Sequence, residues 1–425
     1  MALRLYEGGP MLSCYKVLDL TNEKGFLCGK ALGDLGADVI KIEKPGGEAD
    51  RNIGPFYHDI PDPEKSLYWF AFNANKRGIT LDIETIEGRE IFKKLVKTAD
   101  VVIESFAPGY MDKLGLGYTV LSHVNPRIIL TSISGFGQEG PYRDYNDRDI
   151  AVWALSGFMY IMGDPDRPPL APSYPHGYLV GAMNGALGTM VALCHCQVTG
   201  IGQQVDASSH QGLVFSTFIE THVPWHLQRT FLRREGRNRW QVTSKDGRIS
   251  LPSLWECKDG AVAFFMLTGS ASLTSNTAMV EWMQKDGIDP GVLGRWDWNT
   301  MDWSNFTVND AKEVAQTFNK FFLQHTMMEL LEGALKYDIQ MTPLLKPKDQ
   351  LKFPQFVERK FFIEVDHPDL CTKITYPGGF ARFTEAACGI RFRAPLIGEH
   401  NDEVYKKELG LSTEELVALK QRSVI

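Results

Sequence analysis

Residues 167–205 constrain the fold of this chain more than any other stretch, because they combine length with almost no charge. The segment contains neither Asp nor Glu, and its only full charge is Arg167. The chain carries 52 acidic residues in 425, so roughly five would be expected here at average usage. So long a segment with so little charge predicts burial inside the folded protein.

The apolar part of this stretch predicts a helix that begins near Gly177. Gly177, Gly181, Gly185 and Gly188 recur at a spacing close to 3.6, so they share one helical face. Glycine lowers helix propensity, and such a face indicates close approach of another backbone or of a ligand. Two interpretations stay open: a core helix packed tightly on a neighbour, or a helix start at an active-site floor, where free N–H groups face a ligand.

Composition and charge exclude several classes of protein. The run 177–194 is just long enough for a membrane span, but its polar residues and glycines favour a buried helix of a soluble protein. The net charge of −7 argues against general nucleic-acid binding. Seven scattered cysteines, an odd number, and no signal-like N-terminus indicate reduced thiols in the cytoplasm. The triplet Cys194-His195-Cys196 has no matching ligand pair nearby and is interpreted as core rather than as a metal site.

The first third of the chain alternates strand-like and helix-like segments. Strands are expected at 16–21, 38–43, 99–105 and 127–137, another follows Asn75, Lys76 and Arg77, and helices are expected at 25–37 and 86–97. This alternation predicts an α/β fold with a mainly parallel sheet covered by helices on both faces. Ligands bind such sheets at the carboxyl ends of the strands. The loop 44–51, with Lys44 and Arg51, fits either an anion-holding loop or a plain solvated turn.

The rest of the chain is less regular. Residues 206–235 are expected to form a long connecting helix, and the Trp-rich stretch 236–310 a smaller α+β domain with a hairpin in 255–267. Helices are expected at 309–336, strand-like segments within 338–395, and a charged helical tail at 401–421. A capping box begins at Ser412.

Seven of these stretches, in order and spanning nearly the whole chain, carry a resemblance to a known family. They are VLDLT…LGDLGADVIKIEKPGGEADR (17–51), NANKRGITLDI (73–83), ADVVIESFAPG (99–109), NPRIILTSISGFGQEGPY (125–142), DIAVWALSGFM (149–159), GQQVDASSHQG (202–212) and PLIGEHNDEVYKKELGLSTEEL (395–416). Together they resemble the class III CoA-transferases, the family of formyl-CoA and carnitine CoA-transferases. Alpha-methylacyl-CoA racemase shares this fold.

The resemblance implies an interlocked dimer whose subunits pass through each other like linked rings. It implies a Rossmann-like large domain from both chain ends (1–205 and the return segment 311–425), a connecting helix (206–235) and a small domain (236–310). The substrate would be a CoA thioester bound at the carboxyl-end loops, with no metal and no bound redox cofactor. The residues carried over as CoA-binding are Lys44, Asn75, Lys76, Arg77, Phe106 and Gly135.

The chain departs from the family at the catalytic positions. The family's nucleophilic aspartate lies four residues before the glycine that matches Gly181, and this chain has Gly177 there. A shift of one or two residues does not restore it, because 167–205 contains no acid. The histidine of the racemase branch corresponds to Arg148, so racemisation is not expected. Ser105 and Ala107 replace the family's Asn and Arg near the CoA site.

Three hypotheses follow. The favoured one is a non-catalytic subunit of a heteromeric class III CoA-transferase, whose paralogous partner carries the aspartate. This arrangement resembles benzylsuccinate CoA-transferase of anaerobic toluene degradation, which has two related subunits. The second is an active acyl-CoA enzyme with another nucleophile, for which Glu23, Asp149 and Glu399 are the acids to consider. The third is a CoA-binding regulatory or structural protein without turnover.

Overall fold

The computed structural model describes residues 10–163, 167–216, 239–264, 266 and 272–425. It divides into two compact units, the first formed by Met1–Ile161, Leu170–Leu232 and Glu358–Ile425, the second by Met162–Pro169 and Arg233–Val357. Residues 311–357, which were expected in the return segment, therefore belong to the second unit. The return to the first unit begins only at Glu358.

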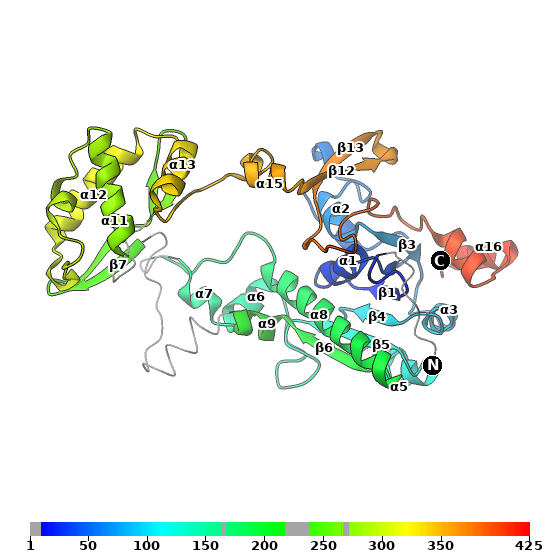
Figure 1. Cartoon of the computed structure of the whole chain (residues 1–425). Coiled ribbons are helices and arrows are strands. Elements are labelled where there is room, and N and C mark those ends of the chain that lie inside the picture. Colours follow the sequence, from blue (N-terminus) through cyan, green and yellow to red (C-terminus); the bar gives the residue numbers. More distant parts are fainter. Residues whose placement is uncertain (1–9, 164–166, 217–238, 265, 267–271) are drawn as a thin grey trace. The chain divides into compact units, whose positions relative to one another are not determined.

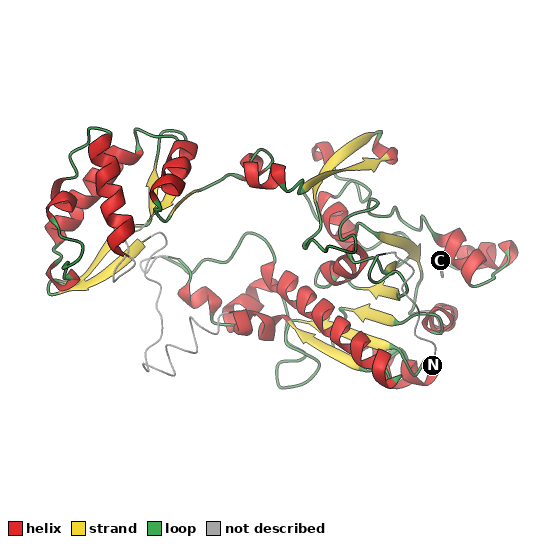
Figure 2. Cartoon of the chain, viewed as in Figure 1, coloured by secondary structure: helices red, strands yellow, loops and turns green. Residues whose placement is uncertain are grey.

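The first unit contains a six-stranded parallel sheet in the order β3-β2-β1-β4-β5-β6 (Figures 1 and 2). Its strands are β1 (Lys16–Leu20), β2 (Asp38–Glu43), β3 (Lys76–Thr80), β4 (Val101–Glu104), β5 (Ile129–Ser134) and β6 (Gln204–Ser208). This is the order of doubly wound nucleotide-binding sheets, in which the sequence of strands reverses its order at the point between β1 and β4. The expected parallel α/β sheet is confirmed.

Helices cover this sheet. They are α1 (Phe26–Asp34), α2 (Leu67–Asn73), α3 (Ile86–Val96), α4 (Tyr110–Lys113), α5 (Tyr118–Val124), α6 (Asp149–Leu155), α7 (Phe158–Ile161), α8 (His176–Thr199) and α9 (Ser209–Ser216). Short 3-10 turns lie at Ala49–Asn52 and Tyr57–Asp59. The expected helix over 206–235 is wrong at its start, because residues 206–208 belong to edge strand β6; residues 217–235 of that prediction lie outside the described part of the chain.

Helix α8 packs along β5 and β6 and against α1 and α9 (Figure 1). A Cβ at Gly181 would lie 3.1 Å from the Ser209 Cα, and one at Gly185 would lie 2.9 Å from the Ile133 Cδ1. The glycine face therefore allows the close approach that its spacing predicts. Among the described helices α8 alone has the length and apolarity of a membrane span, and 44% of its most apolar window is buried in the protein.

The opposite face of α8 differs from the sequence expectation. Met183, Leu187, Val191 and Val198 are all exposed, and Leu187 retains 64% of its accessible surface. The prediction of burial thus holds for one face of the helix only. In the Cys194-His195-Cys196 triplet, likewise, Cys196 is buried while the other two side chains are exposed.

The carboxyl-terminal segment completes the first unit. It forms the hairpin of β12 (Phe362–His367) and β13 (Thr372–Pro377), a 3-10 turn at Pro368–Leu370, a π-helix at Glu403–Glu408 and α16 (Thr413–Gln421). The predicted capping box at Ser412 is confirmed. Trp69 donates its indole N–H to the Pro395 carbonyl at 3.1 Å, and the Thr80 N–H binds the Asn401 side chain at 2.9 Å. Both ends of the chain therefore build one unit.

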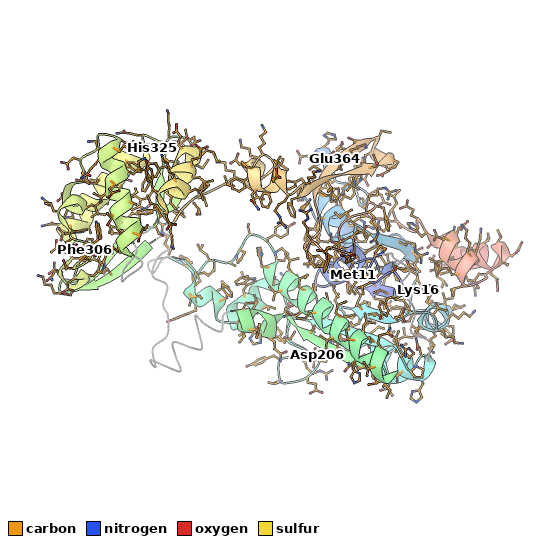
Figure 3. The ribbon with its side chains drawn as sticks, viewed as in Figure 1. Met11, Lys16, Asp206, Phe306, His325 and Glu364 are labelled. Atoms are coloured by element: carbon orange, nitrogen blue, oxygen red, sulfur yellow. The ribbon has the colours of Figure 1, made fainter. Side chains whose placement is uncertain are left out.

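The second unit surrounds an aromatic core. Its strands are β7 (Arg239–Ser244), β8 (Gly247–Pro252), β9 (Leu254–Glu256), β10 (Ala261–Phe264) and β11 (Met341–Pro343). Its helices are α11 (Ser272–Lys285), α12 (Val308–Phe322), α13 (Met327–Tyr337) and α14 (Pro347–Gln350), with 3-10 turns at Gly291–Arg295 and Trp303–Asn305. In the sequence, α15 (Pro354–Glu358) spans the division between the two units. Strands β9 and β10 form the expected antiparallel hairpin. Phe306 lies in the core, and His325 packs on the ring of Phe321 (Figure 3).

Candidate functional site

The loops after β1, β4 and β5 meet at the carboxyl edge of the sheet. Asn22 donates its N–H to the Ser105 hydroxyl at 2.8 Å, and this hydroxyl donates to the Asn22 side-chain oxygen at 2.8 Å. The Lys24 ammonium binds the Asp147 carboxylate at 2.9 Å. These contacts join the loops that follow β1, β4 and β5, and in sheets of this order ligands bind at the carboxyl ends of the strands between β1 and β4.

The start of α8 lies beside a carboxylate from another helix. Asp149, at the beginning of α6, accepts the Tyr178 backbone N–H at 3.0 Å. A Cβ at Gly177 would lie only 2.8 Å from the Asp149 Oδ1. Burial raises the pKa of Asp149, although the N–H groups of Tyr178 and Gly177 favour its charged form. Position 177 therefore supplies no nucleophile itself, but a half-buried carboxylate occupies the helix start.

The negative charge of Asp149 also acts on Glu23. Its pKa is raised, first by burial and then by the negative charges of Asp50, Asp149 and Asp147. Glu399, the third acid considered from sequence, is bound by Arg393 at 2.9 Å and caps the Leu396 N–H. Although burial opposes its charge, these hydrogen bonds hold the pKa of Glu399 below its usual value. Two of the three suspected acids thus interact electrostatically, and the third stabilises the return segment.

Lys44 and Phe106, which were expected to bind CoA, are linked through Glu84 and Tyr110, which the sequence analysis did not identify. The Lys44 ammonium, just after β2, binds Glu84 Oε1 at 2.9 Å, and the Tyr110 hydroxyl donates to the same oxygen at 2.5 Å. The ring of Tyr110 packs on Phe106, with the ring centroids 4.8 Å apart. Lys44, Glu84, Phe106 and Tyr110, here called the strand-end cluster, thus follow the carboxyl ends of β2, β3 and β4.

The polar groups of three other expected CoA-binding residues are already engaged inside the protein. The Lys76 ammonium is fully buried and contacts Asp19, Asn73 and the Phe26 carbonyl at 2.8–2.9 Å. Asn75 adopts φ 65° and bonds to Asp34 and to the backbone of residues 389–392. Arg77 is paired with Asp38, Glu403 and Glu408.

Gly135 directly follows strand β5. It is buried, and its N–H binds Asp147 at 3.2 Å. A Cβ at this position would lie 2.3 Å from the Asp147 Cβ. Gly135 is therefore required for the close packing of the loop after β5, and it lies at the same edge of the sheet as the strand-end cluster.

Glu104 is a buried carboxyl group at the end of β4. Its carboxylate accepts the Phe106 N–H at 2.8 Å, and burial raises its pKa to about 7. A folded-state pKa above the unfolded value of about 4.5 gives stability that is complete below that value and is lost as the pH rises through 7.

The substitution Glu104→Gln tests this pH dependence. Gln stays neutral and can still accept the Phe106 N–H. As the pH rises from 5 to 8, the free energy of unfolding of the variant should therefore increase by about 1–3 kcal/mol relative to that of the native chain. Urea unfolding at both pH values measures the difference. A stability difference that does not change with pH would contradict the assignment.

Among the described residues, no three His, Cys, Asp or Glu side chains are grouped so that they could hold a metal ion. The described cysteines are all free thiols. What the strand-end cluster offers instead is the exposed Lys44 ammonium and the rings of Phe106 and Tyr110, and half-buried carboxylates such as Asp149 lie at the same edge of the sheet.

Comparison with known proteins identifies the family. The model of CoA-transferase family III matches residues 12–401. The chain is 33% identical over 404 residues to the succinyl-CoA:(R)-benzylsuccinate CoA-transferase subunit BbsE of Thauera aromatica, covering 93% of this chain and 94% of that protein. It is 30% identical to the succinyl-CoA–L-malate CoA-transferase beta subunit of Chloroflexus aurantiacus, covering 94% of each chain.

A solved structure supports the same conclusion. The crystal structure of a CAIB/BAIF family protein from Brucella suis superposes with a TM-score of 0.80 at 26% identity, covering 94% of this chain and all of that chain. The resemblance drawn from the seven sequence stretches is thereby confirmed. The chain belongs to CoA-transferase family III.

Proposed function

We propose that this chain is the non-catalytic subunit of a heteromeric class III CoA-transferase. The observation that carries the proposal is the missing nucleophile: Gly177 stands at the aspartate position, and no acid lies between residues 167 and 205. Transfer of an acyl group onto and off an enzyme oxygen needs a carboxylate there. A paralogous partner that retains the aspartate would supply it.

The proposed reaction moves CoA from a donor thioester such as succinyl-CoA to another carboxylic acid, for which an aryl-substituted succinate is the candidate. The likeness to a benzylsuccinate CoA-transferase subunit supports this substrate class and a role in anaerobic aromatic degradation. The complex would work in the cytoplasm as an interlocked dimer of the two related subunits, without nucleic acid or membrane. The free thiols are compatible with that compartment.

This chain would contribute binding groups to the proposed complex. In the strand-end cluster, the Lys44 ammonium can pair with a phosphate of CoA, and the rings of Phe106 and Tyr110 offer an aromatic surface to its adenine. Asn75, Lys76 and Arg77 would act indirectly, by fixing the strand β3 and the return segment that packs against it.

A second candidate function follows from one observation. The Asp149 carboxylate lies at the start of α8, beside Gly177, which stands at the position of the missing aspartate. In this alternative Asp149 replaces the missing nucleophile, and the chain is an active acyl-CoA enzyme by itself. A CoA-binding regulatory protein without turnover is the third possibility.

Co-expression with paralogues that retain the aspartate tests the proposal. The chain alone and the mixed complex are purified, sized and assayed for exchange of CoA between succinyl-CoA and candidate acids. We expect activity only in the mixed complex. Activity of the chain alone would overturn the proposal, and its loss in the Asp149→Asn variant would establish the second candidate. A mixed complex that forms but never exchanges CoA would favour the third.

A further inference from the structure

The strand-end cluster contains a carboxylate that competes with its own cation. Glu84 lies in the turn between β3 and α3, and its Oε1 accepts hydrogen bonds from both Lys44 and Tyr110. These two hydrogen bonds, from Tyr110 first and then from Lys44, keep the pKa of Glu84 below its usual value. Glu84 is therefore an anion fixed between the ammonium and the aromatic pair.

The geometry of this anion matches that of a bound phosphate oxygen. The distance of 2.9 Å between Lys44 Nζ and Glu84 Oε1 is the length of a charge-assisted N–H···O bond, which a phosphate oxygen would also make. We infer that Glu84 occupies the position of a CoA phosphate in the free chain and must leave it when CoA binds. This inference rests on the proposed function, in which Lys44 holds that phosphate.

Displacement of Glu84 is feasible because both partners are exposed. The side chains of Lys44 and Glu84 keep 57% and 47% of their accessible surface, so each can be solvated once the pair separates. By contrast, the Lys24–Asp147 pair at the same edge keeps only 18% and 25%. An exposed pair contributes little stability, yet it must be broken before the ligand gains the ammonium. Glu84 thus lowers the affinity for CoA.

The experiment compares CoA affinities of the purified chain by isothermal titration calorimetry at low salt. Glu84→Gln removes the competing charge and should tighten CoA binding by about 3- to 10-fold. Glu90→Gln is the matched control, because Glu90 forms an equally short exposed pair with Lys93 on α3, at 2.9 Å, and should leave the affinity unchanged. In a Lys44→Ala background, Glu84→Gln should lose most of its effect.

The outcomes separate this inference from the proposed function. If the native chain binds CoA and Glu84→Gln behaves like Glu90→Gln, or binds more weakly, Glu84 is not a competitor. If neither the native chain nor any variant binds CoA, the CoA-binding part of the proposed function fails, and this inference fails with it. Repeating the titration with dephospho-CoA identifies the phosphate: a smaller gain from Glu84→Gln assigns the 3′-phosphate, and an equal gain assigns the diphosphate.

Discussion

Replacing Lys76 with methionine is expected to lower the free energy of unfolding by about 3–5 kcal/mol. The Lys76 ammonium and the Asp19 carboxylate are both fully buried and lie 2.8 Å apart. Desolvation opposes the charged forms of both groups. The attraction of Lys76 and Lys41 outweighs it for Asp19, whose pKa is lowered, whereas for Lys76 burial dominates and lowers the pKa to about 8. Without the ammonium, the buried carboxylate keeps its hydrogen bonds to Thr21 and the attraction of the buried Lys41, but it loses its direct ion pair.

Urea unfolding followed by far-UV circular dichroism measures this loss. Lys44→Met is the matched control, since Lys44 is exposed and its removal should cost less than about 1 kcal/mol. The double variant Asp19→Leu, Lys76→Met should recover part of the stability, because it removes the unpaired charge as well. A Lys76→Met variant as stable as Lys44→Met would mean that the buried pair does not contribute as its geometry indicates.

The contrast between these two lysines shows what the sequence can predict. Both lie in stretches that resemble the family, and both were expected to bind CoA. The fold then places Lys44 after the end of β2, where it is exposed, and Lys76 at the beginning of β3, where it is buried. A motif identifies the residue, but its position at one end of a strand or the other decides whether its side chain is exposed to a ligand.

Secondary structure was predictable where the local pattern was strong. Strand β2 matches its predicted range, because its β-branched residues Val39, Ile40 and Ile42 are followed closely by a Pro-Gly-Gly turn. Strand β6 was missed, because QVDAS at the edge of the sheet mixes exposed and buried positions and continues directly into α9. The role of Glu84 and Tyr110 could not be predicted either, since the two residues are 26 positions apart and meet only in the folded sheet.

The segment 167–205, which contains no acidic residue, illustrates a further limit. Its composition predicted an apolar helix correctly, and its glycine spacing identified the packed face. The exposed face, with Leu187 and Val191, has the same apolar character as the buried one. Composition therefore predicts that a helix is apolar, but it does not predict which of its faces the chain buries.

In the proposed mixed complex, replacing the partner's aspartate with asparagine should reduce CoA exchange by about 10³-fold or more, because the acyl group then has no nucleophile. Asp149→Asn in this chain should change the rate by less than about 3-fold. The Asn side-chain oxygen can still accept the Tyr178 N–H, so the start of α8 keeps its partner while the carboxylate is lost.

The comparison of these two substitutions decides which subunit performs the chemistry. Asp149→Ala serves as the structural control: it leaves the Tyr178 N–H without its acceptor and should cost about 1 kcal/mol of stability, as the loss of a helix cap does. If Asp149→Asn lowers exchange as much as the partner's substitution does, while its stability matches the native chain, the carboxylate beside Gly177 takes part in the reaction. Gly177 would then mark a relocated nucleophile rather than a silent site, since Asp149 Oδ1 already lies 2.8 Å from where a side chain at 177 would begin.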